Sequence, residues 1–335
     1  MSSLVNVTIH RSQFPESVRN DLLESLRSRR VNHKFHYDSN KQTQKWLRLH
    51  EAYSPSRSDP DCSATYERSF AAAAERIPSQ RVHLIGLGCG GGQKDARLLK
   101  LLQKAGKEVF YTPSDVSAAM VLVAQAEATK FIGKKKCFSL VCDLASAGDW
   151  EGIFEHVETA GAARLITFFG MIPNFEPDVI LPRLSGFLRS NDWLLFSANL
   201  APGDDYAAGV KKVLPLYDNE LTRDWLLTFL LDLGVERTDG EIKFVIEEDP
   251  PGGGLKRIAA YFDFRRRCRI SVDAENFEFQ PGESFRLFFS YRHTPALVRQ
   301  MLEAHEMQVL EQWVTKSEEE GVFLLGTGAP TSRSA

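Results

Sequence analysis

The residues best placed to do chemistry lie in a glycine-rich stretch in the first third of the chain. Five glycines occur within the seven positions 86–92, directly after the strand-like run 82–85. Glycines at such a place let the backbone turn tightly and approach a ligand that a Cβ atom would block. Residues 93–103 are expected to form the next helix, whose N-terminus offers free N–H groups to an anionic or polar ligand. The stretch therefore predicts a nucleotide-type cofactor site at the mouth of an α/β sheet.

Acidic residues at the ends of the next two predicted strands narrow the choice of cofactor. Asp115 ends a strand over 108–115, and Asp143 lies at the end of a strand over 137–144. The spacing Gly86-x-Gly88-x-x-Gly91 also fits the dinucleotide fingerprint with Asp115 as ribose-binding acid, and a purely structural glycine turn is a third interpretation. A fourth strand over 163–170 leads to the polar Asn174. Two acids and this polar residue favour the layout of class I S-adenosylmethionine (SAM) methyltransferases.

The C-terminal segment separates the two cofactor hypotheses further. A helix is predicted over 295–305, and two strand-like segments at 308–314 and 321–326 are joined by a polar turn. This pattern indicates an antiparallel hairpin. Class I methyltransferases end their sheet in this way, whereas dinucleotide-binding domains usually stay parallel. We therefore predict an α/β fold with a Rossmann-like class I SAM-methyltransferase sheet that closes with an antiparallel hairpin.

The order of the predicted elements divides the chain into three parts. Residues 1–60 are polar with a cluster of aromatic residues, and are expected to cover the substrate and the cofactor. Residues 61–200 and 295–330 carry the SAM-binding core, with its fifth strand over 193–198. Between them, residues 201–294 break the alternation of strands and helices. A helical part at 206–233 is followed by strand-like segments at 242–246 and 257–269, which predicts an inserted α+β substrate-binding lobe.

Composition excludes several other classes of protein. The chain has 335 residues and a net charge of −3 with mixed signs, so it lacks the basic footprint of a nucleic-acid-binding protein. No apolar run approaches the length that spans a membrane, and the N-terminus has no signal-peptide pattern. The five cysteines show neither a paired spacing nor a metal-site spacing. We expect a cytoplasmic protein without a metal, which acts on a small amino-acid or amine substrate.

Eight segments, in order and at matching spacing, resemble one known family over almost the whole chain. They are 35–38 (Phe-His-Tyr-Asp), 50–57 (similar to the family's PEYYPTR segment), 88–94, 113–117, 169–177, 216–222, 282–283 and 290–292. On these segments the chain resembles the histidine-specific N-α-methyltransferases that form hercynine in ergothioneine biosynthesis. The resemblance implies transfer of methyl groups from SAM, with S-adenosylhomocysteine (SAH) as product, to the α-amine of an amino acid. It also implies repeated methylation, and we expect a monomer.

The resemblance assigns roles to particular residues of this chain. The cofactor-binding residues that it implies are Tyr37, Gly88, Gly90, Lys94, Asp115 and Asp143. Tyr53, Asn174 and Tyr217 match the catalytic positions that hold the amine and the carboxylate of the substrate, and Ser290 matches a serine of the same site. Without the resemblance, Tyr37 and Tyr53 are better explained as core aromatic residues, and Asn174 could be an ordinary turn residue.

Three positions depart from the family pattern. The glutamate that grips the substrate imidazole is replaced by Phe288, and a methionine on the imidazole side is replaced by Ala260. Gly86 stands at the position where the family usually has an acidic residue before the glycine motif. Because phenylalanine cannot satisfy a buried imidazole N–H, the substitutions predict a pocket for an apolar or aromatic side chain, such as that of tryptophan, phenylalanine or tyrosine.

Other interpretations of the same residues stay open. Histidine remains a candidate substrate if Arg292 or His293 supplies a polar contact to the imidazole. A register offset of two residues would place Arg286 instead of Phe288 in the pocket. The chain could also bind SAM without catalysing transfer.

Overall fold

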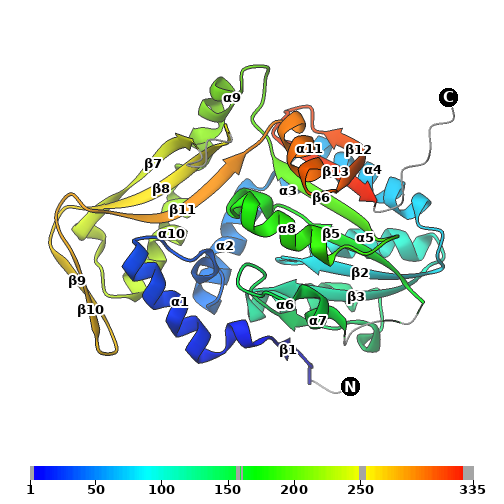
Figure 1. The fold of residues 1–335 in the computed structure, drawn as a ribbon, viewed down its shortest axis with the longest axis horizontal. Coiled ribbons are helices and arrows are strands. Elements are labelled where there is room, and N and C mark those ends of the chain that lie inside the picture. Colours follow the sequence, from blue (N-terminus) through cyan, green and yellow to red (C-terminus); the bar gives the residue numbers. More distant parts are fainter. Residues whose placement is uncertain (1–3, 156–158, 160, 249–253, 327–335) are drawn as a thin grey trace.

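The computed structural model describes residues 4–155, 159, 161–248 and 254–326, and one eight-stranded sheet forms its centre (Figure 1). The strand order is β1-β4-β3-β2-β5-β6-β13-β12. The bounds are β1 Thr8–Ile9, β2 Arg81–Leu87, β3 Glu108–Asp115, β4 Leu140–Val141, β5 Ala163–Phe168, β6 Trp193–Asn199, β12 Gln308–Val314 and β13 Glu320–Gly326. β13 pairs antiparallel with β6 and with β12, whereas the other neighbouring strands run parallel. The structure confirms the predicted α/β fold and its closing hairpin.

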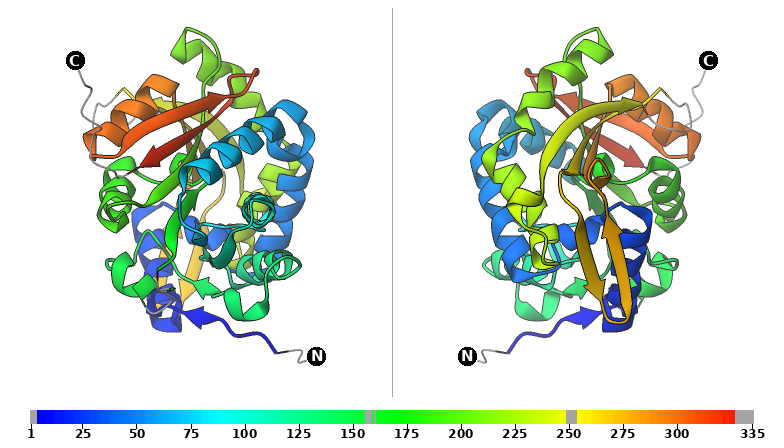
Figure 2. Two further views of the ribbon diagram at one scale, coloured as in Figure 1. Left: turned by 90° about the vertical axis from the view of Figure 1, so that its right-hand side faces the viewer. Right: turned by 90° about the vertical axis from the view of Figure 1, so that its left-hand side faces the viewer.

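Helices cover both faces of this sheet (Figure 2). Strand β2 places apolar side chains on both faces of the sheet. Leu84 packs into the core on one face, and Leu87 packs into the core on the other. One face carries α4 (Pro60–Arg76), α5 (Gln93–Lys104) and α6 (Ala118–Ala128). The other face carries α7 (Trp150–Glu155), α8 (Pro177–Phe187) and α11 (Pro295–Ala304). Strands buried on both faces account for the continuous apolar runs in the sequence.

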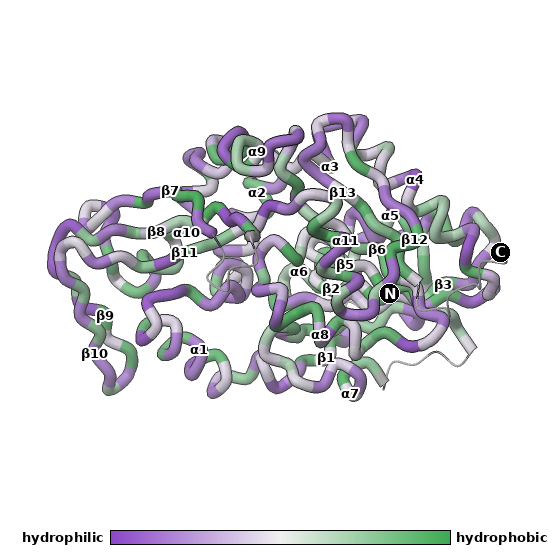
Figure 3. Tube along the Cα trace, turned by 45° about the horizontal axis from the view of Figure 1, so that its top comes forward, coloured by the Kyte–Doolittle hydropathy of each residue, from purple (hydrophilic) through white to green (hydrophobic). Residues whose placement is uncertain are grey.

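A second lobe stands beside the sheet, at the left of Figure 1. Its helices are α9 (Tyr206–Val213) and α10 (Glu220–Asp232), and its sheet has the order β11-β8-β7. The bounds of its strands are β7 Gly240–Glu248, β8 Lys256–Phe264, β9 Cys268–Val272, β10 Glu275–Phe279 and β11 Ser284–Arg292. The separate hairpin of β9 and β10 alternates between hydrophobic and hydrophilic residues along each strand (Figure 3).

Part of the N-terminal segment packs into the core of this second lobe. α1 (Pro15–Ser28) and the turn that follows contribute Leu23, Leu26 and Phe35 to the same core as Phe285 of β11. The backbone of Val31 also donates to that of Arg286 at 2.9 Å. α2 (Asn40–Tyr53) and the short α3 (Pro55–Ser58) then lead back to the large sheet.

Several element boundaries differ from the sequence-based expectation. The third strand of the core is only the two-residue β4, and it gains an unpredicted neighbour in β1. The helical part at 206–233 is two helices, since Pro215 lies in the 3₁₀ turn between them and cannot donate a backbone hydrogen bond. The strand-like part at 257–269 is divided between β8 and β9. Residues 327–330, which we expected within the core, lie outside the described residues.

Candidate active site

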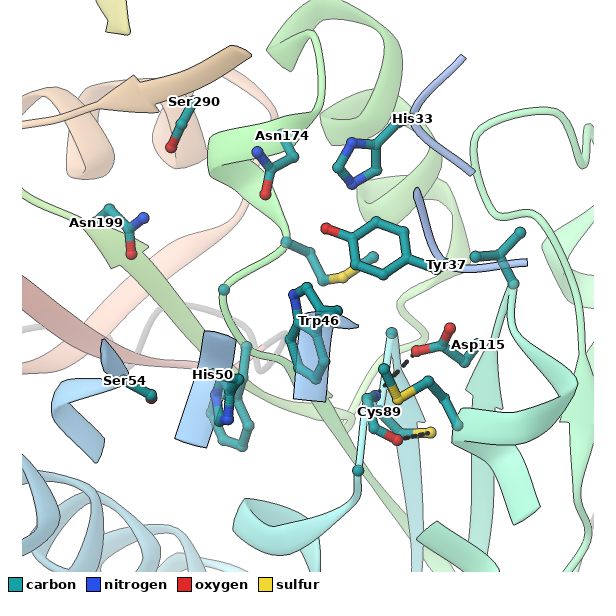
Figure 4. A pocket seen from close by; sticks show the side chains of 18 of the residues that line it. His33, Tyr37, Trp46, His50, Ser54, Cys89, Asp115, Asn174, Asn199 and Ser290 are labelled. Atoms are coloured by element: carbon teal, nitrogen blue, oxygen red, sulfur yellow. Dashed lines mark hydrogen bonds between the residues drawn. The ribbon is translucent and has the colours of Figure 1, made fainter. Parts of the chain in front are cut away.

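A cavity of about 460 Å³ opens at the carboxyl-terminal ends of the central strands. Residues at or near the ends of β2, β3, β5 and β6 line it, namely Leu87, Asp115, Thr167 and Asn199. Its other walls come from α2, α10 and β11, so the cavity lies where the two lobes meet (Figure 4). The strand order reverses between β2 and β5, and open α/β sheets bind their ligands next to that point.

The glycine-rich loop forms one wall and is tied to Asp115. Gly88 and Gly90 adopt positive φ angles of 67° and 52°, and a Cβ atom on Gly88 would collide with the side chain of Met171. The backbone N–H of Gly90 donates to Asp115 Oδ2 at 2.9 Å, and that of Ser117 donates to Oδ1 at 3.0 Å. Burial raises the pKa of Asp115 to about 6, against the effect of these hydrogen bonds. The loop therefore holds a carboxylate in place at the cavity wall.

A second carboxylate lies beneath this loop, next to Gly86. A Cβ atom on Gly86 would collide with Asp95 Oδ2, so the side chain of Asp95 fills the space beside the glycine. Asp95 accepts hydrogen bonds from the hydroxyls of Tyr111 at 2.7 Å and Thr167 at 2.9 Å. Burial raises the pKa of Asp95 to about 6. The cavity thus has an acid here although position 86 lacks one.

Asp143 lines the cavity beyond the end of β4. Its Oδ1 accepts from the backbone N–H of Ala145 at 2.9 Å, while its Oδ2 is buried and has no hydrogen-bond partner in the structure. The ammonium group of Lys34 is 3.9 Å from Oδ2 and forms a closer ion pair with Asp21 of α1. Buried acceptors are normally satisfied, so Oδ2 suits an N–H donor of a ligand.

Lys94 lies at the opposite end of the loop, on the first turn of α5. Its ammonium group donates to the hydroxyl of Tyr66 at 2.6 Å and is 3.4 Å from Glu320 Oε1. The Tyr66 hydroxyl donates its proton to Glu320, and Ser197 Oγ lies 3.0 Å from the same oxygen. Lys94 and Glu320 both line the cavity, and together they present one positive and one negative charge there.

Asn174 lines the cavity from the turn after β5, and β11 holds that turn in place. Its Nδ2 donates to the backbone oxygen of Phe289 at 2.7 Å. Two residues further on, Glu176 accepts from the Tyr291 hydroxyl at 2.6 Å and pairs with Arg257 at 3.2 Å. Three contacts thus join the turn to β8 and β11, and Figure 4 shows Asn174 facing Tyr37 and Ser290 across the cavity.

Aromatic rings and two hydroxyls form the wall on the side of the second lobe. The hydroxyls of Tyr217 and Ser290 are 2.9 Å apart. The ring centre of Phe288 lies 6.2 Å from that of Tyr217 and 5.9 Å from that of Trp225. Ala260 pairs with Phe288 across the strands and is fully buried behind it, so it does not itself line the cavity.

The aromatic residues near the N-terminus complete the enclosure. Tyr37 is partly buried, and desolvation together with the nearby Asp115 raises the pKa of its hydroxyl well above the ordinary value. Its ring lies 6.0 Å from that of Trp46, which stacks on His50 at 4.7 Å. Burial lowers the pKa of His50 to about 3. Tyr53, at the end of α2, also lines the cavity but is 52% exposed, which places it at the rim.

A β-bulge determines which side chains of β11 face the cavity. The pairing of β11 with β8 shifts between Arg286 and Phe288. Beyond this shift Phe288, Ser290 and Arg292 line the cavity, whereas Arg286 and His293 do not. His293 is fully buried with no hydrogen-bond partner for either ring nitrogen, and burial lowers its pKa to about 4. Phe288 therefore lines the cavity, and Arg286 lies outside it.

A family model described as histidine-specific, SAM-dependent methyltransferase matches residues 18–221 and 253–327. The chain belongs to this family. The protein is thus a SAM-dependent methyltransferase, and SAM is its cofactor. The matched residues include α9 and β8 to β11 of the second lobe, whereas residues 222–252, with most of α10 and all of β7, lie outside the match. A comparison with curated proteins found no match.

Solved structures similar to this methyltransferase share little sequence with it. Magnesium protoporphyrin IX methyltransferase from Synechocystis PCC 6803, with bound SAH, is 13% identical, with a TM-score of 0.45 over 85% of this chain and 94% of its own. The 1,6-didemethyltoxoflavin N1-methyltransferase of Burkholderia thailandensis is 11% identical, with a TM-score of 0.41 over 86% and 89% of the two chains.

The residues of the cavity fit the cofactor of the family. Asp143 Oδ2, which accepts no hydrogen bond, suits the amino group of an adenine, and the buried Asp115 carboxylate suits a pair of ribose hydroxyls. Lys94 and Glu320 offer opposite charges to the zwitterionic methionine end, beside the backbone of Gly88 and Gly90. When bound, SAM supplies an activated methyl group on its sulfonium.

Sequence reasoning missed several residues of the cavity. Asn199 could have been found, since it directly follows the predicted fifth strand over 193–198, at the strand end where ligands of α/β sheets bind. Nothing in the sequence indicated three other cavity residues, because only the fold brings them to the cavity: Lys34, Glu320 and Trp225. Within the described parts of the chain, no cluster of three or more His, Cys, Asp or Glu side chains could hold a metal ion. None of the helices described has the length and apolar character needed to cross a membrane.

Proposed function

We propose that the protein transfers methyl groups from SAM to the α-amine of an amino acid with an apolar or aromatic side chain. The observation that carries this proposal is the wall formed by Phe288, Tyr217 and Trp225. The family resemblance expects a carboxylate for imidazole at position 288. A ring there favours a tryptophan, phenylalanine or tyrosine side chain through burial of apolar surface and ring contacts.

The polar groups beside this wall suit the backbone of an amino acid. The Nδ2 of Asn174 donates to the backbone oxygen of Phe289, so the Oδ1 of Asn174 remains as an acceptor for an amine. The Tyr217 hydroxyl can donate to a carboxylate, and Ser290 lies next to it. We assign Tyr53, at the rim of the cavity, to the same group of substrate contacts.

The chemistry asks little of these residues beyond positioning. An amine attacks an activated methyl group in line only when its lone pair is free and held at near-attack distance. The α-ammonium must first lose a proton, and a site enclosed by Tyr37, Trp46 and Trp225 lowers its pKa by disfavouring the charged form. Repeated transfer, up to the trimethylated product, is what the family resemblance implies.

The test is methyl transfer by the purified protein, with SAM and each of the twenty amino acids in separate reactions followed by mass spectrometry. A mass gain of one, two or three methyl groups on an aromatic amino acid supports the proposal. The same gain on histidine alone overturns the argument from Phe288. Binding of SAH without transfer to any amino acid overturns the catalytic proposal.

A further inference from the structure

Arg292 is a buried cation at the substrate side of the cavity. It ends β11, lines the cavity and is only 7% exposed. Its Nη1 donates to the backbone oxygen of Leu200 at 3.0 Å. Its Nε and Nη2 donate to the Tyr217 hydroxyl at 3.1 and 2.9 Å, so two donors of one guanidinium meet a single oxygen.

No carboxylate within the described parts of the chain forms an ion pair with this guanidinium. The other buried arginine of this sheet, Arg257, pairs with both Glu247 and Glu176. A buried charge without a counter-charge is costly, and folded proteins rarely keep one. The cost is relieved if a ligand brings a negative charge into the cavity.

The hydrogen bonds of Arg292 also determine whether the Tyr217 hydroxyl acts as a hydrogen-bond donor or as an acceptor. A tyrosine hydroxyl has one proton to donate and two lone pairs to accept with. The Nε–H and Nη2–H groups of Arg292 occupy both lone pairs, so the hydroxyl can only donate. Its proton points to Ser290 Oγ, 2.9 Å away, or to an acceptor of a ligand in the same space. A hydroxyl held as a donor beside an unpaired positive charge is a receptor for an anion.

We propose that Arg292 is the positioning residue that makes a carboxylate a requirement for the substrate. It supplies the counter-charge and holds Tyr217 as a hydrogen-bond donor, so an amino acid is used in preference to the amine that lacks its carboxylate. The inference rests on the proposed function for the identity of the reacting amine. It deepens that proposal, because it names the group that separates amino acids from decarboxylated amines.

The test compares tryptophan with tryptamine, and phenylalanine with phenethylamine, in the wild type and in four variants. Loss of a charge-assisted hydrogen bond changes affinity by roughly 10- to 150-fold. We therefore expect R292M to lower kcat/KM for the amino acids by this factor, mainly through KM, and to leave the amines unchanged. Y217F should act in the same direction, and R292K should recover part of the loss. R286Q is the matched control, since Arg286 lies on the same strand outside the cavity.

Binding measurements keep this inference separate from the proposed function. With SAH bound, indole-3-propionate carries the carboxylate and ring of tryptophan but no amine, and calorimetry reports its affinity. If R292M weakens this binding while no amino acid is methylated, the proposed function fails and the role of Arg292 stands. If amino acids are methylated but R292M reduces amino acid and amine equally, or weakens SAH instead, the role of Arg292 is refuted.

Discussion

Replacing Phe288 with glutamate tests the side-chain pocket most directly. The ring is 9% exposed, and its neighbours in the cavity wall are the rings of Tyr217 and Trp225. Position 288 lies two residues before Ser290 on β11, and both side chains face the cavity. F288E therefore places a carboxylate beside the space that we assign to the substrate side chain, without altering the groups that hold the amine.

The expected change has two parts. A charge-assisted hydrogen bond from imidazole to the new carboxylate is worth about 1.5–3 kcal/mol. Loss of the ring contact with an aromatic substrate costs about 0.5–1.5 kcal/mol. Together they shift the preference for histidine over tryptophan by about 2–4.5 kcal/mol, or roughly 30- to 2,000-fold. Burial raises the pKa of the introduced carboxyl, which moves the result at neutral pH toward the lower end.

The assay is a competition between equal concentrations of histidine and tryptophan. Mass spectrometry of the two methylated products gives the ratio of their kcat/KM values directly. F288Q is the matched control, because it has the shape of glutamate without the charge, and F288L removes the ring alone. If F288E leaves the ratio within about threefold of wild type, or if F288Q equals it, the assignment of this wall to the substrate side chain is wrong.

Three further predictions follow from the site and its supports. E176Q should lower kcat/KM for the substrate by about tenfold while SAH affinity stays unchanged, since Glu176 positions Asn174 through Tyr291 and Arg257; steady-state kinetics and calorimetry check this. SAH affinity should fall by up to about tenfold per pH unit below pH 6, where Asp115 becomes protonated, and calorimetry of D115N should show weak binding without this slope. Burial lowers the pKa of His293 to about 4, so its contribution to the stability of the fold is complete above the unfolded pKa of 6.5 and is lost as the pH falls from 6.5 toward 4. We therefore expect H293L to reduce the pH dependence of the free energy of unfolding in this range by up to about 1.4 kcal/mol per pH unit, as measured by urea unfolding.

The fold could be predicted well where the chain forms buried parallel strands. Continuous apolar runs indicated β2, β3, β5 and β6, and the two strands of the closing hairpin followed from their separation by a polar turn. Prediction was weak at the sheet edge, because β4 has only two residues and β1 pairs with it from the far N-terminus. Such pairings depend on tertiary contacts that leave no periodic pattern in the sequence.

The candidate site could be predicted where its residues lie in the strand ends and the loops after them. Asp115, Asp143 and Asn174 follow strands, and the fold brings all three to one cavity. The counter-charges and positioning groups could not be predicted in this way. Lys34 reaches Asp143 from the N-terminal segment, and Glu176 reaches β11 from the turn after β5, so both contacts are products of the packing of the two lobes.

The departures from the family pattern at positions 86 and 288 differ in their chemical consequence. At position 86 the missing acid is offset, because Asp95 on the first turn of α5 places its carboxylate in the space beside the glycine. At position 288 nothing comparable occurs, since the ring contacts of Phe288 are to Tyr217 and Trp225. The carboxylates in the cavity wall are Asp95, Asp115, Asp143, Glu319 and Glu320. They come from the large sheet and the loops and helix at its edge, whereas the wall around Phe288 comes from α10, β11 and the turn that carries Tyr217. The acid near position 86 therefore stays on the cofactor side, and our proposal assigns the change in the accepted side chain to the departure at 288.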